Sequence, residues 1–198
     1  MNSGSCFKRK SGLKELHELS ELKFLKVENL DLRNYRGVEF PKQMSSFTNL
    51  VYFSLEDCNK CQHLPPLEQL PYLKRLYLNK LDSLEYMSEI DYSEELSNSS
   101  FIPSLESLQS LEIKWCSKLE SLPEGMSGLT SLHRLYIWCC PKLKSLPEGI
   151  QGLTSLYTLQ IIHCPILLER CKRETGEDWP KIAHIPNLEG DLYQQQTN

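Results

Sequence analysis

The sequence predicts an α/β repeat solenoid with one parallel β-sheet, and three observations support this fold class. The 198 residues contain 35 Leu but only 1 Ala, whereas Ala is the most favoured residue in ordinary helix bundles. The 11 Pro residues argue further against long helices, because proline breaks a helix interior. The third observation is an internal repeat of 24 residues, a period typical of proteins that stack small structural units.

The repeat is clearest in the C-terminal half of the chain. Three segments follow one another at a step of 24 residues: Leu111-Glu112-Ile113, Leu135-Tyr136-Ile137 and Leu159-Gln160-Ile161. Three looser copies lie upstream at a step of 23 residues: Leu30-Asp31-Leu32, Phe53-Ser54-Leu55 and Leu76-Tyr77-Leu78. The six units share the pattern L-x-x-L-x-L-x-x-(Cys or other)-x-x-L, which is the leucine-rich-repeat pattern.

Each unit predicts a short strand followed by a return segment. In L-x-L the apolar residues recur with period two, so both lie on one face of a strand. Pro and Gly mark the return, as in Leu146-Pro147-Glu148-Gly149, and few helix formers are present there. We therefore expect a leucine-rich-repeat arc with a parallel β-sheet on its concave face and irregular or 3₁₀ turns on its convex side. One unit cannot bury its leucines alone, so stability requires stacking.

The repeats and their interruptions predict the domain boundaries. Leu76 and Leu111 are 35 residues apart, which places an acidic, Ser-rich insertion near 88–102 between two repeats. Pro165 and Gly176 bracket a short apolar segment and predict a helix, so 165–188 is expected to cap the last repeat. We expect a flexible N-terminus at 1–12, a leucine-rich-repeat domain of about six repeats at 13–188, and a flexible tail at 189–198.

Composition and motifs exclude several classes of function. The net charge of −4 argues against a general nucleic-acid binder, which needs a basic surface. No apolar stretch is long enough to span a membrane, and the polar N-terminus lacks the apolar core of a secretion signal, so we expect a cytoplasmic protein. The sequence contains no phosphate-binding glycine loop, nucleophile elbow or zinc-protease motif. We therefore expect no enzymatic activity, no catalytic residue and no cofactor.

The cysteines favour a structural role, although two metal-site interpretations can be drawn. Cys58-x-x-Cys61 resembles half of a zinc or redox site, but no second pair follows, and Cys58 falls at the repeat's Cys position. A set of His163, Cys164, Cys171 and His184 has no typical ligand spacing. We predict no metal site, and we expect Cys116, Cys140 and Cys164 to stack in a buried column.

The outward positions of the strands provide the candidate partner-binding residues. Aromatic and cationic side chains fall together on the expected concave face: Arg75, Tyr77, Lys114, Trp115, Arg134, Tyr136 and Trp138. Exposed Trp, Tyr and Arg dominate the energetics of protein interfaces, so we predict that this face binds a protein. The alternative is that some of these side chains fold down to cover the sheet.

Several segments resemble a known family. They are Arg33–Gly37 with Phe40-Pro41, Asn49–Val51 with Asp57–Cys61, Leu64–Pro71, and the tail segments His163–Pro165, Arg170-Cys171, Gly176–Trp179 and Lys181–Pro186. Together they resemble the C-terminal leucine-rich-repeat region of plant coiled-coil nucleotide-binding disease-resistance proteins, over about residues 13–188. Gln43 departs from the family's usual Trp in its Phe-Pro-x-Trp segment.

The resemblance implies a role in plant innate immunity. A repeat region of this family binds a pathogen-derived effector or a host guard protein, and it restrains the nucleotide-binding domain of the full-length receptor. No coiled-coil or nucleotide-binding segment is found in these residues, so nucleotide exchange is assigned to none of them. The chain is then a fragment, a truncated gene product or a free repeat protein. The alternative function is that of a secreted leucine-rich-repeat inhibitor of a microbial enzyme, which would show a signal peptide and paired terminal cysteines.

Overall fold

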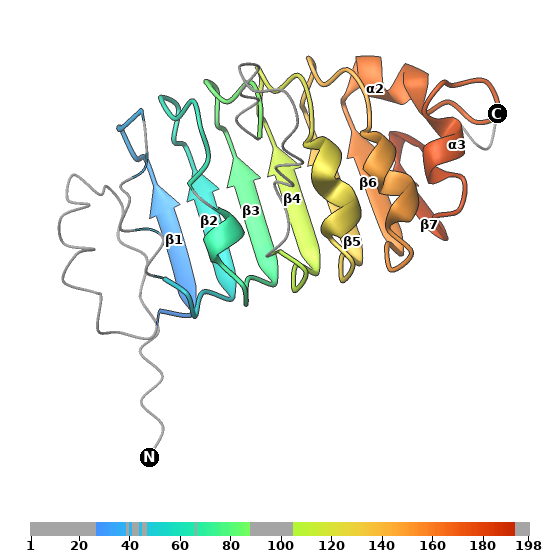
Figure 1. Cartoon of the computed structure of the whole chain (residues 1–198). Coiled ribbons are helices and arrows are strands. Elements are labelled where there is room, and N and C mark those ends of the chain that lie inside the picture. The colour runs from blue at the N-terminus through green and yellow to red at the C-terminus, as the bar shows by residue number, and fades with distance from the viewer. Residues whose placement is uncertain are drawn as a thin grey trace, which may run out of the picture.

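Seven parallel strands form a single open sheet, with their order in space the same as their order in the chain (Figure 1). The computed structural model describes residues 27–38, 40, 44, 47–65, 67–87 and 105–192. The strands are β1 (Asn29–Arg33), β2 (Tyr52–Glu56), β3 (Arg75–Asn79), β4 (Ser110–Lys114), β5 (Arg134–Trp138), β6 (Thr158–Ile162) and β7 (Asn187–Gly190). The architecture confirms the predicted leucine-rich-repeat arc.

The strands pair in the register that the repeat predicts. Leu111 pairs with Leu135, and Leu135 pairs with Leu159. Leu76 pairs with Leu111 in the same way, although 35 residues separate them. The insertion therefore leaves the ladder intact, because a slip of one residue would turn every leucine to the opposite face.

The core is a continuous stack of leucine side chains behind the sheet. Both apolar positions of each strand from β1 to β6 are buried, and Phe53, Ile113, Leu135 and Ile161 are fully enclosed. Burial of one such side chain contributes about 1.5–3 kcal/mol. Each repeat unit forms one rung of the solenoid and covers the apolar side chains of its neighbours. This stabilisation therefore accumulates only when the rungs stack.

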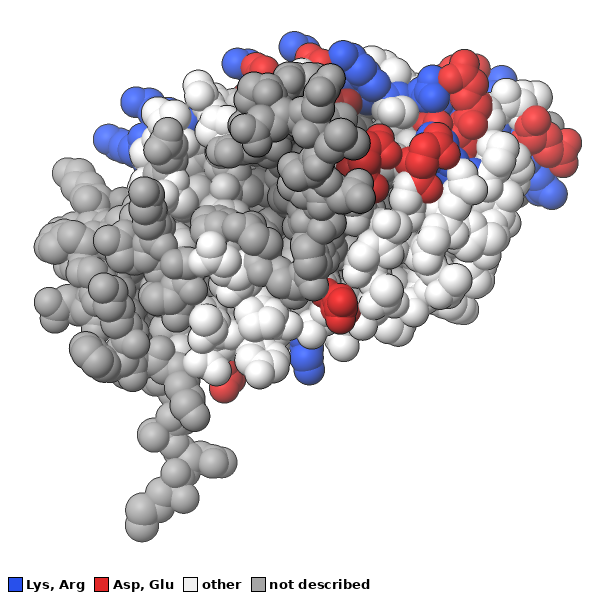
Figure 2. All heavy atoms as spheres, viewed as in Figure 1, with Lys and Arg blue, Asp and Glu red and all other residues white. Residues whose placement is uncertain are grey.

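The convex side consists of short 3₁₀ turns, as the Pro and Gly residues predict. These are η3 (Leu67–Gln69), η4 (Glu124–Gly128) and η5 (Glu148–Gly152). Pro123 and Pro147 precede the last two in extended conformation. A Cβ at Gly149 would lie 2.7 Å from the Glu124 carbonyl oxygen, so glycine permits adjacent turns to pack closely. Figure 2 shows few charged side chains over these turns and many along the edge where the strands end.

The residue after each of the first six strands has a positive φ, between 54° and 58°. They are Asn34, Asp57, Lys80, Trp115, Cys139 and His163. The first five donate their main-chain N–H to a carbonyl of the next rung, as Trp115 does to the Trp138 oxygen at 2.9 Å. On the sixth rung the N–H of His163 is instead satisfied by the Asp191 carboxylate, at 2.7 Å. The left-handed turn thus belongs to the repeat and is no sign of local strain at Trp115.

The C-terminal cap contains two short helices and a strand that the sequence did not predict. The helices are α2 (Pro165–Arg170) and α3 (Trp179–Ile182), as expected for a helical cap. β7 then pairs with β6, placing Leu188 beside Leu159. Glu189 and Gly190 belong to this strand, so ordered structure crosses the boundary expected at 188. Of the expected tail, 193–198 lie outside the described residues, as do 1–12 and the insertion at 88–102.

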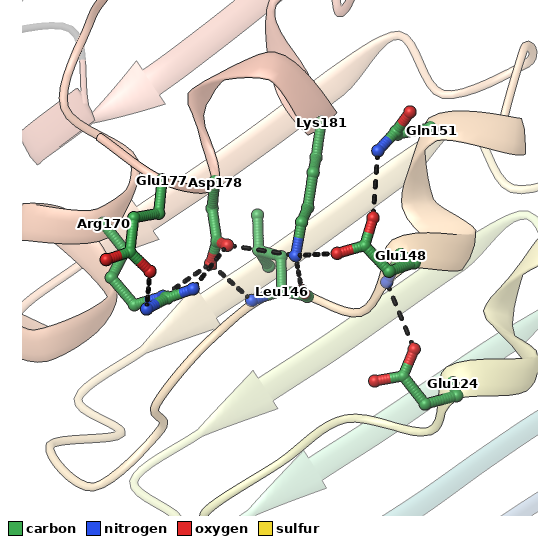
Figure 3. A network of polar contacts seen from close by, with 8 residues as sticks. All are labelled: Glu124, Leu146, Glu148, Gln151, Arg170, Glu177, Asp178 and Lys181. Atoms are coloured by element: carbon green, nitrogen blue, oxygen red, sulfur yellow. Dashed lines mark hydrogen bonds and ion pairs between the residues drawn. The ribbon is translucent and has the colours of Figure 1, made fainter. Parts of the chain in front are cut away.

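A buried charge cluster holds the cap against the fifth rung (Figure 3). The Asp178 carboxylate is fully enclosed. It accepts hydrogen bonds from the Leu146 main-chain N–H at 2.9 Å and from the Arg170 guanidinium at 3.1 and 3.2 Å. Lys181 lies 3.0 Å from the same carboxylate, donates to the Leu146 carbonyl at 2.8 Å and pairs with Glu148 at 2.8 Å. Every charge in this cluster therefore has a partner.

The cysteines form a buried column, as predicted. Cys116, Cys140 and Cys164 are fully enclosed, and the Cys140 main-chain N–H donates to the Cys164 sulfur at 3.3 Å. A hydrogen bond with Cys116 and burial raise the pKa of Cys140 to about 12, so this thiol stays protonated at neutral pH. Cys58 and Cys61 are likewise enclosed and donate to main-chain carbonyls. This placement favours core packing over a zinc site.

Candidate functional site

Six of the seven predicted partner-binding residues occupy outward positions on three adjacent strands, and Trp115 directly follows the middle strand, β4. We call these residues the β3–β5 face: Arg75, Tyr77, Lys114, Trp115, Arg134, Tyr136 and Trp138. Register places Arg75, Ser110 and Arg134 in one row, and Tyr77, Glu112 and Tyr136 in the next. The structure thus brings six of these side chains to one face and Trp115 to its edge, and it does not give them one environment.

Lys114 is held at the centre of the face. Its ammonium lies 4.0 Å from the Trp138 ring centre and 5.1 Å from the Tyr77 ring centre, and it pairs with Glu112 at 2.8 Å. Two aromatic faces and a carboxylate therefore satisfy this cation. Burial raises the pKa of the Tyr77 hydroxyl, and the nearby Glu56 and Glu112 carboxylates add to the shift, so the phenol stays neutral.

Trp138 continues this packing toward the cap. Its indole N–H donates to the Gln160 side-chain oxygen at 2.7 Å, and the Gln160 amide donates to Glu189 at 2.9 Å. A lateral chain of contacts thus runs from Tyr77 on β3 to Glu189 on β7. Tyr77, Lys114 and Trp138 partly cover the sheet, in agreement with the alternative raised for some of these residues.

Trp115 has a different environment. It follows β4, and 55% of its surface is exposed. Its main chain adopts the left-handed turn, and no hydrogen bond of its indole is found among the described residues. Its main-chain N–H donates to the Trp138 carbonyl at 2.9 Å, and an exposed tryptophan is the type of anchor that protein interfaces use.

Arg75 and Arg134 are exposed and have no carboxylate partner within the described part of the chain. The Arg75 guanidinium lies over the Tyr52 ring, 5.2 Å from its centre. The carboxylates of the neighbouring strands are already engaged: Asp31 and Glu56 with Arg33 at 3.3 and 2.7 Å, and Glu112 with Lys114. Two cationic groups therefore remain open to a ligand at the start of β3 and β5.

Three further residues contribute to the face although they were not selected from the sequence. Tyr52 supports Arg75, Glu112 pairs with Lys114, and Gln160 orients Trp138. All three occupy outward positions in the period-two pattern, so the pattern identifies their location. Their contacts depend on side-chain conformations across strands, which the pattern does not specify.

The groups of the face are of the types that protein interfaces use. Its groups are guanidinium, ammonium, phenol and indole, and its two carboxylates nearest the centre, Glu56 and Glu112, are paired with cations. Among the described residues, no group of three or more His, Cys, Asp or Glu side chains could hold a metal ion. The described helices are all too short to cross a membrane.

Comparisons with known proteins agree with the repeat assignment. Residues 8–81 match the family of R13L1/DRL21 leucine-rich repeats. A disease resistance RPP13-like protein of Arabidopsis thaliana is 38% identical over 61 residues, which are 30% of this chain and 6% of that protein. A second Arabidopsis disease resistance protein is 35% identical over 99 residues, 45% of this chain and 7% of the relative.

A solved structure extends the comparison to most of the chain. The leucine-rich repeat domain of the type III effector XopL superposes with a TM-score of 0.65 and 26% identity, over 87% of this chain and 53% of that one. This likeness supports the fold, whereas the sequence matches support the family. The repeats and their register show a leucine-rich-repeat solenoid, and its sequence is similar to leucine-rich repeats of plant disease resistance proteins, of whose length the chain spans only a small part.

Proposed function

We propose that this chain is a protein-recognition module of plant innate immunity that binds its partner through the β3–β5 face. The observation that carries the proposal is the combination, on one open parallel sheet, of exposed Trp115 with two arginines that lack carboxylate partners. Parallel sheets are usually covered on both faces. A face that is left bare and bears interface-type residues therefore favours a protein ligand.

The partner is a pathogen-derived effector or a host guard protein. Within a full-length receptor, the same repeat region restrains the nucleotide-binding domain. The matches to plant disease resistance proteins support a role in defence, and both partners follow from the resemblance to the repeat region of that family. The module itself is non-catalytic, because its side chains offer cation, aromatic and hydrogen-bonding contacts without an unpaired acid, base or nucleophile at the centre of the face.

Binding through this face is tested by comparing variants for retention of a plant protein partner. Trp115→Asn removes the exposed ring, and asparagine tolerates the left-handed backbone at this position. Tyr72→Asn is the matched control, because Tyr72 is equally exposed but lies in the turn before β3. We expect wild type and Tyr72→Asn to retain the partner and Trp115→Asn to lose it. Retention by a variant that lacks both Trp115 and Trp138 would contradict the proposal.

We further propose an intracellular location, where thiols remain reduced. The seven cysteines of the described residues are all unpaired. Titration of denatured, unreduced protein should therefore give eight free thiols for the 8 Cys of the sequence. A count of six or fewer would indicate disulfides and favour the secreted inhibitor instead.

A further inference from the structure

We propose that the β3–β5 face recognises an acidic segment of its protein partner, with two carboxylates three residues apart bound by Arg75 and Arg134. This inference deepens the proposed function and rests on it. It specifies the chemistry of the segment that binds to the face. The starting point is the two arginines that have no carboxylate partner among the described residues.

One motif repeats on alternate strands of the face. Arg75-Leu76-Tyr77 on β3 and Arg134-Leu135-Tyr136 on β5 carry the same side chains at the same register positions. Ser110 on β4 lies between the two arginines. Each unit therefore presents a guanidinium with a phenol two residues further along the same face, a pair that can donate several hydrogen bonds to one carboxylate.

The surrounding charges do not neutralise this pair of arginines. Arg33 pairs with Asp31 and Glu56, Lys80 pairs with Asp57, and Lys114 pairs with Glu112. Lys74 and His133 directly precede the two arginines in sequence and are also exposed. Where β3, β4 and β5 begin, Lys74, Arg75 and Arg134 thus outnumber the exposed Glu106 carboxylate, although the whole chain carries a net charge of −4.

Geometry defines the spacing of the ligand groups. Arg75 and Arg134 start strands that are two positions apart in the sheet, a separation of about 9.6 Å. The Arg75 guanidinium lies over the Tyr52 ring on β2, on the side of β3 that is away from β5, so the two guanidinium groups do not converge on one small anion. A polyproline II segment rises about 3.1 Å per residue with three residues per turn. Residues i and i+3 of such a segment therefore point the same way and lie about 9.3 Å apart, which matches the spacing of the two strands that carry the arginines.

The experiment is selection from a displayed library of random 12-residue peptides, followed by fluorescence anisotropy with the peptides selected. We expect wild type to enrich peptides with Asp or Glu at positions i and i+3. Arg75→Gln and Arg134→Gln should each weaken binding about tenfold or more, because each removes a charged hydrogen-bonding partner. Arg36→Gln is the charge-matched control, since Arg36 is an exposed arginine in the loop after β1. Its binding should equal that of wild type.

The other outcomes separate this inference from the proposed function. Wild type could instead select peptides that lack the acidic pair and that no longer bind to Trp115→Asn. This result would overturn the carboxylate assignment and leave the β3–β5 face as the binding surface. Peptides that bind equally to wild type, Trp115→Asn and Arg134→Gln would overturn both, as would a library that yields no binder. An equal loss of affinity in Arg36→Gln would show a general effect of net charge and would also overturn the carboxylate assignment.

Discussion

Two arginines of this chain show how differently the fold uses the same side chain. Arg170 in the cap donates to both oxygens of the enclosed Asp178 carboxylate and also contacts Glu177. Arg134 on the β3–β5 face is exposed and has no carboxylate partner among the residues that the structure describes. The cap cluster is internally complete and fixes the end of the solenoid. The face is incomplete, and its unmatched groups are those from which we infer a partner.

Removal of the Asp178 carboxylate should produce the largest loss of stability. In Asp178→Ala, the buried Lys181 ammonium and the Arg170 guanidinium lose their shared counter-charge, and the Leu146 N–H loses its acceptor. Breaking a buried ion pair by deleting one partner costs about 3–5 kcal/mol, measured as the free energy of unfolding in urea. Glu177→Ala is the control, because Glu177 is 75% exposed. If both variants lowered the free energy of unfolding equally, the buried Asp178 carboxylate would not be the group that holds the cap against the fifth rung.

The same carboxylate should make stability depend on pH. Burial raises the pKa of Asp178, but the hydrogen bonds from Arg170, Leu146 and Lys181 outweigh it, so the net pKa lies below the ordinary value. A lowered folded-state pKa means that the contribution is complete above the unfolded carboxyl pKa, about 3.9, and is lost as the pH falls through the folded-state pKa. The stability difference between wild type and Asp178→Asn should therefore shrink below about pH 4. A difference that is constant down to acid pH would contradict this assignment.

Replacement of Trp138 should give an intermediate loss of stability. Trp138 belongs to the β3–β5 face, but its side chain already has partners within the chain. Trp138→Ala removes the ring over Lys114 and the hydrogen bond to Gln160. Loss of a half-buried ring and its cation contact should lower the free energy of unfolding by about 1–3 kcal/mol. Trp138→Phe keeps a ring over Lys114 and should recover part of the loss. No change in either variant would mean that the lateral chain of contacts does not stabilise the sheet.

The leucine ladder could be predicted from the sequence because it depends on spacing alone. A period of two on Leu135-Tyr136-Ile137 and a step of 24 residues determine which side chains are inside and which strands are neighbours. β7 was missed because Asn187–Gly190 lacks the Leu-x-Leu pattern and its Leu188 follows Leu159 by 29 residues. An irregular strand of this kind forms because the edge of β6 and the cap position it, and its own sequence pattern does not predict it.

The composition of the face was predictable, but its internal pairing was not. Period two places Lys114, Trp138 and Gln160 outward, whereas their mutual contacts depend on side-chain conformations on three different strands. The cap cluster has the same origin, since it joins the Leu146 main chain to Asp178 across 32 residues of sequence. Such contacts produce no periodic pattern in the sequence. The structure is therefore needed to tell which charged side chains have an ion-pair partner and which do not.

The most direct test of this contrast is the unfolding free energy and selected-peptide affinity of an Arg75→Gln/Arg134→Gln double variant. Exposed groups without ion-pair partners contribute little to folding, and Arg75 has only its contact with the Tyr52 ring, so the free energy of unfolding should change by no more than about 1 kcal/mol. Binding should fall about a hundredfold if the two charged contacts add. A double variant that unfolds more easily but binds as well as wild type would show that these arginines serve the fold, and would contradict the account.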